Sequence, residues 1–140
     1  MSSPLLTVDN LAKRFGGITA LNGVSLSIDS GEIFGLIGPN GAGKTTLFNV
    51  LTGLYAPSAG NVSLAGQSLR GLKPNHVLKL GLARTFQNIR LFANMTALEN
   101  VMVGRHARTS AGVLGAVLRG SRTRAEEAAI RAMAHDLLAR

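Results

Sequence analysis

The sequence predicts an α/β fold organised around a phosphate-binding loop, and three adjacent features carry this prediction. The first is a near-continuous apolar run over residues 33–37, which is typical of a strand buried on both faces. The second is the glycine-rich loop over residues 38–45. The third is a stretch over residues 45–54 whose apolar side chains recur at helical spacing. Strand, loop and helix therefore follow one another in the order that a phosphate site requires.

The segments before the loop predict a small antiparallel β portion. Residues 5–8 and 24–28 have the pattern of short strands, and the second alternates cleanly between apolar and polar side chains. The sequence Asp29-Ser30-Gly31 supplies a turn into the apolar run. We therefore expect two strands to precede the central one.

Shorter elements are expected after the loop helix. Residues 62–64 and 82–86 predict strands, and residues 74–80 predict a short helix. Further along, Thr96 to Glu99 and Thr123 to Glu126 each fit a capping box, in which a threonine and a glutamate three residues later cap one another at a helix start. The second helix should run to about residue 140, and the glycine- and arginine-containing segment 105–122 predicts a flexible loop.

Composition narrows the kinds of chemistry available to the chain. The 140 residues contain no cysteine, which excludes disulfides and thiol-based sites, and 46% are hydrophobic, enough for one domain with a core. The first residues lack the pattern of a secretion signal, and the apolar run over residues 111–118 is far shorter than the roughly 20 residues of a membrane-spanning helix, so we expect a soluble protein.

The charge distribution is uneven. The formal net charge is +8, and no carboxylate occurs between Glu32 and Glu99. This bias suits an anionic ligand, an acidic partner or nucleic acid, although ordinary solvated side chains would give the same count.

The loop matches the phosphate-loop pattern G-x-x-x-x-G-K-[ST] at every required position. Its residues are Gly38, Pro39, Asn40, Gly41, Ala42, Gly43, Lys44 and Thr45. Glycines let successive backbone N–H groups converge on phosphate oxygens, and the positive end of the following helix points to the same place. Lys44 can reach the β and γ phosphates and the Thr45 hydroxyl can ligate Mg²⁺, so the loop is predicted to hold a nucleoside triphosphate.

Two stretches extend this interpretation to a family. The loop GPNGAGKTT, together with ARTFQN at residues 83–88, resembles the ATP-binding subunits of ABC transporters. The stretch over residues 81–106 is most similar to the branch that powers bacterial branched-chain amino-acid importers. The resemblance implies a P-loop NTPase core of the ABC type, with residues 1–94 as a partial nucleotide-binding core and residues 95–140 as the start of a helical subdomain.

The resemblance also implies roles for residues outside the loop pattern. Phe15 matches the aromatic that stacks on adenine, although a core aromatic near a strand end is an alternative. Thr46 would contact the α phosphate. Gln87 matches the glutamine that senses Mg²⁺ and the γ phosphate, so Lys44 and Gln87 would act on the reacting phosphate. Arg84, close to Gln87, has the simpler reading of a solvated charge.

Other family elements have no counterpart in the sequence. Hydrolysis of this type needs a carboxylate that helps to hold Mg²⁺ at the end of an apolar strand and, in the family, an adjacent glutamate that orients water. Neither occurs, and neither do the LSGGQ signature and the histidine that the family carries. We therefore expect the chain to correspond to the front part of an ATP-binding subunit, able to bind ATP and Mg²⁺ but not to hydrolyse ATP alone. We also expect it to be marginally stable or aggregation-prone, because unpaired strand edges expose apolar surface.

In the family, two ATP-binding subunits sandwich Mg-ATP and drive transmembrane permease subunits, with an extracytoplasmic substrate-binding protein as an indirect partner. The resemblance thus implies a cytoplasmic location, peripheral to the inner membrane. That the transported substrates are branched-chain amino acids is likewise implied only by the resemblance. One alternative is a non-hydrolytic nucleotide-binding fragment or regulator. Another is a non-transport ABC ATPase acting on nucleic acid, which only the +8 charge suggests. The aromatic content of 4% offers few stacking platforms, so we expect no nucleic-acid partner.

Overall fold

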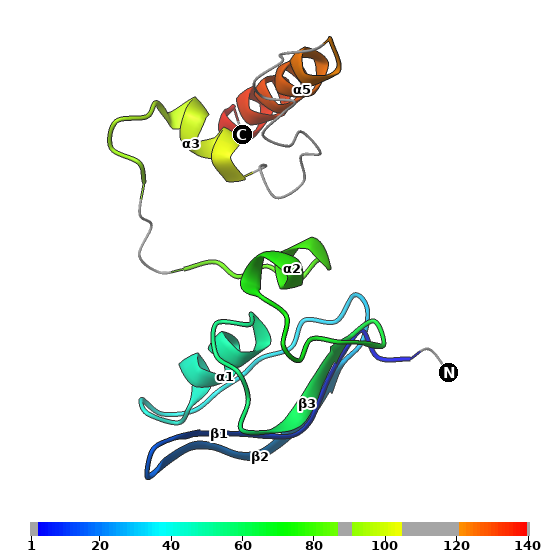
Figure 1. The fold of residues 1–140 in the computed structure, drawn as a ribbon, viewed down its shortest axis with the longest axis vertical. Helices are drawn as coiled ribbons and strands as arrows, with labels where there is room; N and C mark the ends of the chain where they lie inside the picture. The colour runs from blue at the N-terminus through cyan, green and yellow to red at the C-terminus, as the bar shows by residue number, and fades with distance from the viewer. Residues whose placement is uncertain (1–2, 87–90, 105–120, 140) are drawn as a thin grey trace. The chain divides into compact units, whose positions relative to one another are not determined.

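The computed structural model describes residues 3–86, 91–104 and 121–139 (Figure 1). The chain divides into two compact units, Met1–Arg84 and Thr85–Arg140. The predicted division after residue 94 stays a prediction. Among the described helices, none is long and apolar enough to cross a membrane.

The first unit is built on a four-stranded antiparallel sheet with the strand order β2-β1-β3-β4. Its strands are β1 (Leu6–Phe15), β2 (Ile18–Ile28), β3 (Ala59–Leu64) and β4 (Gln67–Ser68). The strands predicted at residues 5–8, 24–28 and 62–64 are confirmed in β1, β2 and β3, although β1 and β2 extend well beyond the predicted bounds. The two-residue β4 was not predicted.

A β-bulge places the core residues of β1 on one face. Leu6 and Val8 alternate as in a regular strand and lie opposite Leu64 and Val62 of β3. The register then shifts between Val8 and Leu11, where Asn10 adopts a positive φ of 45°. The extra residue brings Leu11 to the same buried face, where it is fully buried.

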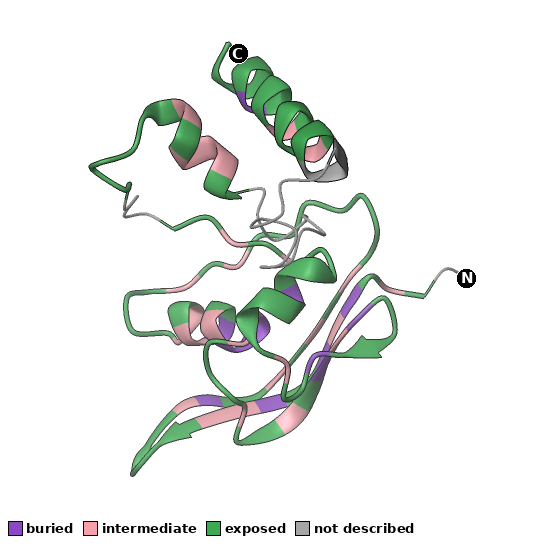
Figure 2. Ribbon diagram, turned by 45° about the horizontal axis from the view of Figure 1, so that its top comes forward, coloured by how far each residue is buried: buried purple, intermediate pink, exposed green. Residues whose placement is uncertain are grey.

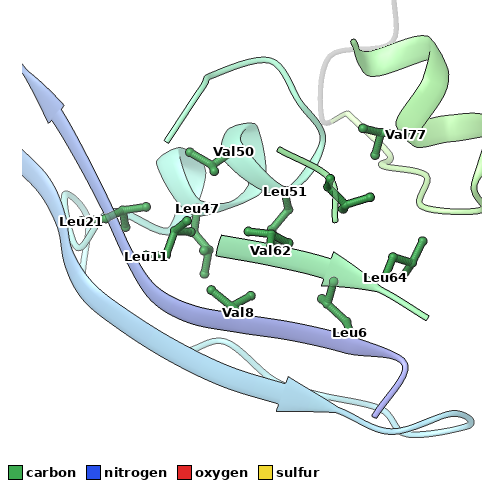
Figure 3. Packing of buried hydrophobic residues seen from close by; sticks show 11 residues of the cluster. Leu6, Val8, Leu11, Leu21, Leu47, Val50, Leu51, Val62, Leu64 and Val77 are labelled. Atoms are coloured by element: carbon green, nitrogen blue, oxygen red, sulfur yellow. The ribbon is translucent and has the colours of Figure 1, made fainter. Parts of the chain in front are cut away.

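Helix α1 (Lys44–Leu51) covers this face of the sheet (Figure 3). Its buried side chains, Leu47, Val50 and Leu51, follow the i, i+3, i+4 spacing of a helix face and join the buried leucines and valines of β1 and β3 in one cluster. Each such burial stabilises the unit by roughly 1.5–3 kcal/mol before the cost of ordering is subtracted. The helix predicted at residues 45–54 is thus confirmed, with a shorter C-terminal end.

Helix α2 (Pro74–Lys79) confirms the helix predicted at residues 74–80. It begins with proline at its first position, where the missing N–H costs nothing. Val77 is its buried residue, with 1% of its surface exposed, and belongs to the same cluster.

The strands predicted at residues 33–37 and 82–86 are wrong, because both segments are irregular. Leu36 and Leu82 pack partly against the core, but Ile33 and Ile37 are 99% and 96% exposed. A central strand needs hydrogen-bonded neighbours on both sides, and all the strands of the described residues pair antiparallel with one another. Apolar content alone therefore did not produce a strand here. The predicted marginal stability stays a prediction.

The second unit contains α3 (Ala97–Gly104) and α5 (Ser121–Leu138), which contact each other. Thr96 Oγ1 accepts from Glu99 N at 3.3 Å, and Glu99 Oε2 accepts from Thr96 N at 2.7 Å, so the first capping box is confirmed. The second is wrong, since α5 already begins at Ser121 and Thr123 lies within it. A capping-box pattern marks a position where a helix can begin, and here Ser121 and Arg122, which precede Thr123, are helical as well.

In Figure 2, α5 is mostly exposed and α3 mixes exposed with intermediate residues. Ala134 is the buried residue of the described part of α5. Most of the loop predicted at residues 105–122 lies outside the described residues.

Candidate functional site

The phosphate-loop segment rests directly on β2, and this contact explains one of its glycines. Gly41 and Gly43 have φ values of 85° and 86°, in the left-handed region that favours glycine. A Cβ atom at Gly43 would lie 2.6 Å from the Ala20 carbonyl oxygen and 3.1 Å from Leu21 Cδ2. Only a residue without a side chain fits there, so Gly43 fixes the loop against the sheet at the point where α1 begins.

The Lys44 side chain lies across the loop. Its Nζ donates hydrogen bonds to the carbonyl oxygens of Gly38 and Pro39, the second at 2.7 Å. Both acceptors are uncharged, so a phosphate oxygen would form the stronger charge-assisted bond with the same ammonium group. The lysine is thus held at the loop by contacts that an anionic ligand can replace.

The start of α1 offers further donors. Its N-cap residue is Gly43, and within the described residues no side chain caps this end. Leu47 N donates to the Gly43 carbonyl oxygen at 2.9 Å as the first helical bond. The N–H groups of Lys44, Thr45 and Thr46 precede this bond, and such groups together with the helix dipole favour an anion. The arrangement can therefore bind phosphate oxygens through backbone groups and one lysine.

The residues present fit a magnesium ion that is held mainly through phosphate. Among the described residues, no group of three or more His, Cys, Asp or Glu side chains could hold a metal ion by itself. Mg²⁺ in nucleotide sites is usually bound by one or two protein oxygens together with phosphate oxygens and waters. Thr45, exposed in the first turn of α1, can supply one such oxygen. Gln87 lies outside the described residues, so its predicted role stays a prediction.

Phe15 is the last residue of β1 and lies in an aromatic cluster that the sequence did not reveal. Its side chain is 43% exposed, so it is not a core aromatic. The ring of Tyr55 meets it edge to face, with 5.3 Å between ring centroids, and Lys13 Nζ lies 4.9 Å from the Phe15 centroid. No sequence pattern marked Tyr55, because its contact with Phe15 joins residues far apart in the chain and forms only when α1 packs on the sheet.

Arg84 is not simply a solvated charge, as the sequence alone suggested. It is half-buried, and its Nη1 donates to Asn49 Oδ1 of α1 at 2.6 Å. Its guanidinium carbon also lies 5.7 Å from the ring centroid of Phe48 in the same helix. Arg84 is therefore tied to the helix that begins at the phosphate loop.

Comparison with known sequences gives the family. The sequence profile described as "ABC transporter" matches residues 21–140. The chain belongs to the ABC transporter family. This assignment covers most of the chain, including the whole phosphate loop and α1, and it confirms the resemblance on which the predicted family roles rest.

Two members of the ABC transporter family are similar to this chain over most of its length. The chain is 48% identical over 119 residues to "High-affinity branched-chain amino acid transport ATP-binding protein LivG" of Salmonella typhimurium, covering 85% of this chain and 47% of that protein. It is 45% identical over the same length to the corresponding protein BraF of Pseudomonas aeruginosa, with the same coverage. The chain spans about half the length of the curated relatives it matches.

A solved structure confirms the predicted fold class. The ADP conformation of MJ1267, an ATP-binding cassette of an ABC transporter, matches with a TM-score of 0.69 and 33% identity, covering 86% of this chain and 47% of that one. The antiparallel sheet and helices of this chain are therefore part of an α/β fold of the ATP-binding cassette type.

Proposed function

We propose that the chain binds Mg-ATP at residues 38–46 and forms the front part of the ATP-binding subunit of an ABC importer for branched-chain amino acids. One observation supports the proposal most strongly. The Lys44 ammonium group and the start of α1, which no described side chain caps, lie at the same glycine-rich loop. The names of the LivG and BraF relatives support the transport assignment.

Each residue of the site has a separate role in this proposal. Backbone N–H groups of the loop and Thr46 bind the phosphates, and Lys44 pairs with the β and γ phosphates. Thr45 and Gln87 hold Mg²⁺, which neutralises phosphate charge when bound. Phe15 stacks on adenine through its exposed ring surface, and Lys44 and Gln87 act on the reacting phosphate.

Hydrolysis is assigned to the whole subunit rather than to this chain alone. Glu32 accepts a hydrogen bond from Asp29 N, and Glu99 caps α3. Neither lies at the end of an apolar strand, where a carboxylate that helps to hold Mg²⁺ is expected. In the proposed assembly, a second ATP-binding subunit, the transmembrane permease subunits and, indirectly, an extracytoplasmic substrate-binding protein are the partners. The subunit then acts at the cytoplasmic face of the membrane. The alternative is a regulator that binds nucleotide without turnover. Such a regulator would change ATP hydrolysis by full-length ATP-binding subunits to which it is added.

The test is a calorimetric titration of the 140-residue chain with Mg-ATP, with phosphate release measured on the same sample. We expect saturable binding without release, and loss of at least tenfold in affinity in Lys44→Ala. Lys79→Ala, which removes an exposed lysine of α2, is the matched control and should bind as the unaltered chain does. A folded sample that binds no nucleotide, or a Lys44→Ala variant that binds as well as the control, would contradict the proposal.

A further inference from the structure

Tyr55 and Phe15 form an edge-to-face pair at the surface of the first unit. Their ring planes meet at 79°, and their centroids are 5.3 Å apart. Tyr55 is 40% exposed and Phe15 is 43% exposed. A phenylalanine exposed to this extent at a strand end would have several orientations open to it, and the edge-to-face contact with Tyr55 favours one of them.

The ammonium group of Lys13 contacts both rings. Its Nζ donates to the Ala56 carbonyl oxygen at 2.8 Å, directly after Tyr55 in the chain. The same ammonium group lies 4.9 Å from the Phe15 centroid and 5.8 Å from the Tyr55 centroid. Attraction between the cation and the two ring faces therefore adds to the edge-to-face contact.

The backbone around Tyr55 connects this pair to the phosphate-loop helix. Tyr55 N donates to the Asn49 carbonyl oxygen of α1 at 3.1 Å. A few residues later, Ser58 N donates to the Ala12 carbonyl oxygen at 2.8 Å, and Ser58 Oγ accepts from Arg14 N at 3.0 Å. Tyr55 is thus fixed at once to the helix that starts at the phosphate loop and to the strand that ends at Phe15.

We propose that Tyr55 is a positioning residue for the nucleotide base: it holds the Phe15 ring at a set orientation relative to α1, so that a purine bound through its phosphates meets the ring face. The inference rests on the proposed function, because it assumes that the triphosphate occupies the loop and that the base stacks on Phe15. It adds a residue that supports the base without being required for phosphate binding.

The chain provides its own probe, since Tyr55 is the single tyrosine and there is no tryptophan. Intrinsic fluorescence excited near the tyrosine band therefore reports on this position alone. We expect Mg-ATP to change this emission and Mg-tripolyphosphate, which carries the phosphates without a base, to leave it unchanged. Equal emission changes with both ligands, or none with a concentration of Mg-ATP that saturates in calorimetry, would overturn the inference without requiring any variant.

Substitutions give the second arm of the test. Tyr55→Leu should weaken Mg-ATP binding by about threefold to tenfold, the range expected for losing one aromatic pair, and leave tripolyphosphate binding unchanged. Tyr55→Phe should restore the affinity for Mg-ATP, and circular dichroism should show that each variant is folded. Unchanged Mg-ATP binding in Tyr55→Leu, with weaker binding in Phe15→Leu, would overturn the role of Tyr55 alone. Failure of the unaltered chain to bind either ligand would overturn the proposed function together with this inference.

Discussion

Alanine at Gly43 should destabilise the first unit more than alanine at Gly41, because only the first substitution meets a neighbouring strand. The two glycines have nearly the same φ, 86° and 85°, so an alanine pays the same left-handed backbone cost of about 1–2 kcal/mol at either position. At Gly41 the space around a new Cβ atom is open, with nothing within 4 Å. At Gly43 the Cβ atom would lie 2.6 Å from the Ala20 carbonyl oxygen.

The expected difference in the free energy of unfolding between the two variants is the cost of relieving that contact. Ordinary van der Waals contact begins at 3.4 Å, so the loop and β2 must separate by about 0.8 Å, and the atom in the way belongs to the backbone. Overpacking of this kind costs about 1–3 kcal/mol. Gly43→Ala should therefore lower the free energy of unfolding by about 2–5 kcal/mol in total, and Gly41→Ala by about 1–2 kcal/mol.

The assay is urea unfolding followed by far-ultraviolet circular dichroism, with the free energy of unfolding extrapolated to water for each variant. Gly66→Ala, at a turn with a φ of 79° and open space around the new Cβ atom, gives the left-handed cost outside the loop. Equal losses for Gly43→Ala and Gly41→Ala would mean that the loop does not rest on β2.

Three further predictions concern other parts of the chain. Leu11→Ala should lower the free energy of unfolding by about 2–5 kcal/mol, because Leu11 is fully buried, while Ile18→Ala at a 71% exposed position should cost far less; similar urea midpoints for the two would contradict this. Arg84→Ala should cost about 1–2 kcal/mol through its bond to Asn49, and a double-mutant cycle with Asn49→Ala showing no coupling energy would rule that bond out as the cause. The backbone and side-chain hydrogen bonds at the start of α3 hold the pKa of Glu99 below its ordinary 4.5, so this support is present above pH 4.5 and is lost as the pH falls through the lowered pKa. Glu99→Gln should thus reduce helical circular dichroism at pH 7 but not in strong acid, and a difference that persists unchanged at low pH would argue against it.

The sequence predicted the features that depend on local signals. The phosphate loop, the helix after it and the capping box at Thr96 each consist of a few neighbouring residues whose chemistry defines the structure. The bounds of β1 and β2 were underestimated, because the bulge at Asn10 interrupts the alternation on which a strand prediction depends.

The features that the sequence did not predict depend on distant partners. Residues 33–37 have the composition of a central strand, but a strand exists only through pairing, which the segment itself does not encode. Tyr55 meets Phe15, and Arg84 meets Asn49, only after α1 has packed on the sheet. Neither contact has a pattern that can be read along the chain, although the first involves Phe15, a residue with a predicted role.

Phosphate binding at the start of α1 can be observed directly by titrating the ¹⁵N-labelled 140-residue chain with Mg-ATP and following the amide resonances of Lys44, Thr45 and Thr46. These N–H groups lie at the start of α1, which no described side chain caps and where the phosphates are proposed to bind. We expect large, saturable shifts at these three amides, and their loss in Lys44→Ala. Resonances that stay in place at saturating nucleotide, or shifts confined to other parts of the chain, would contradict phosphate binding at this position.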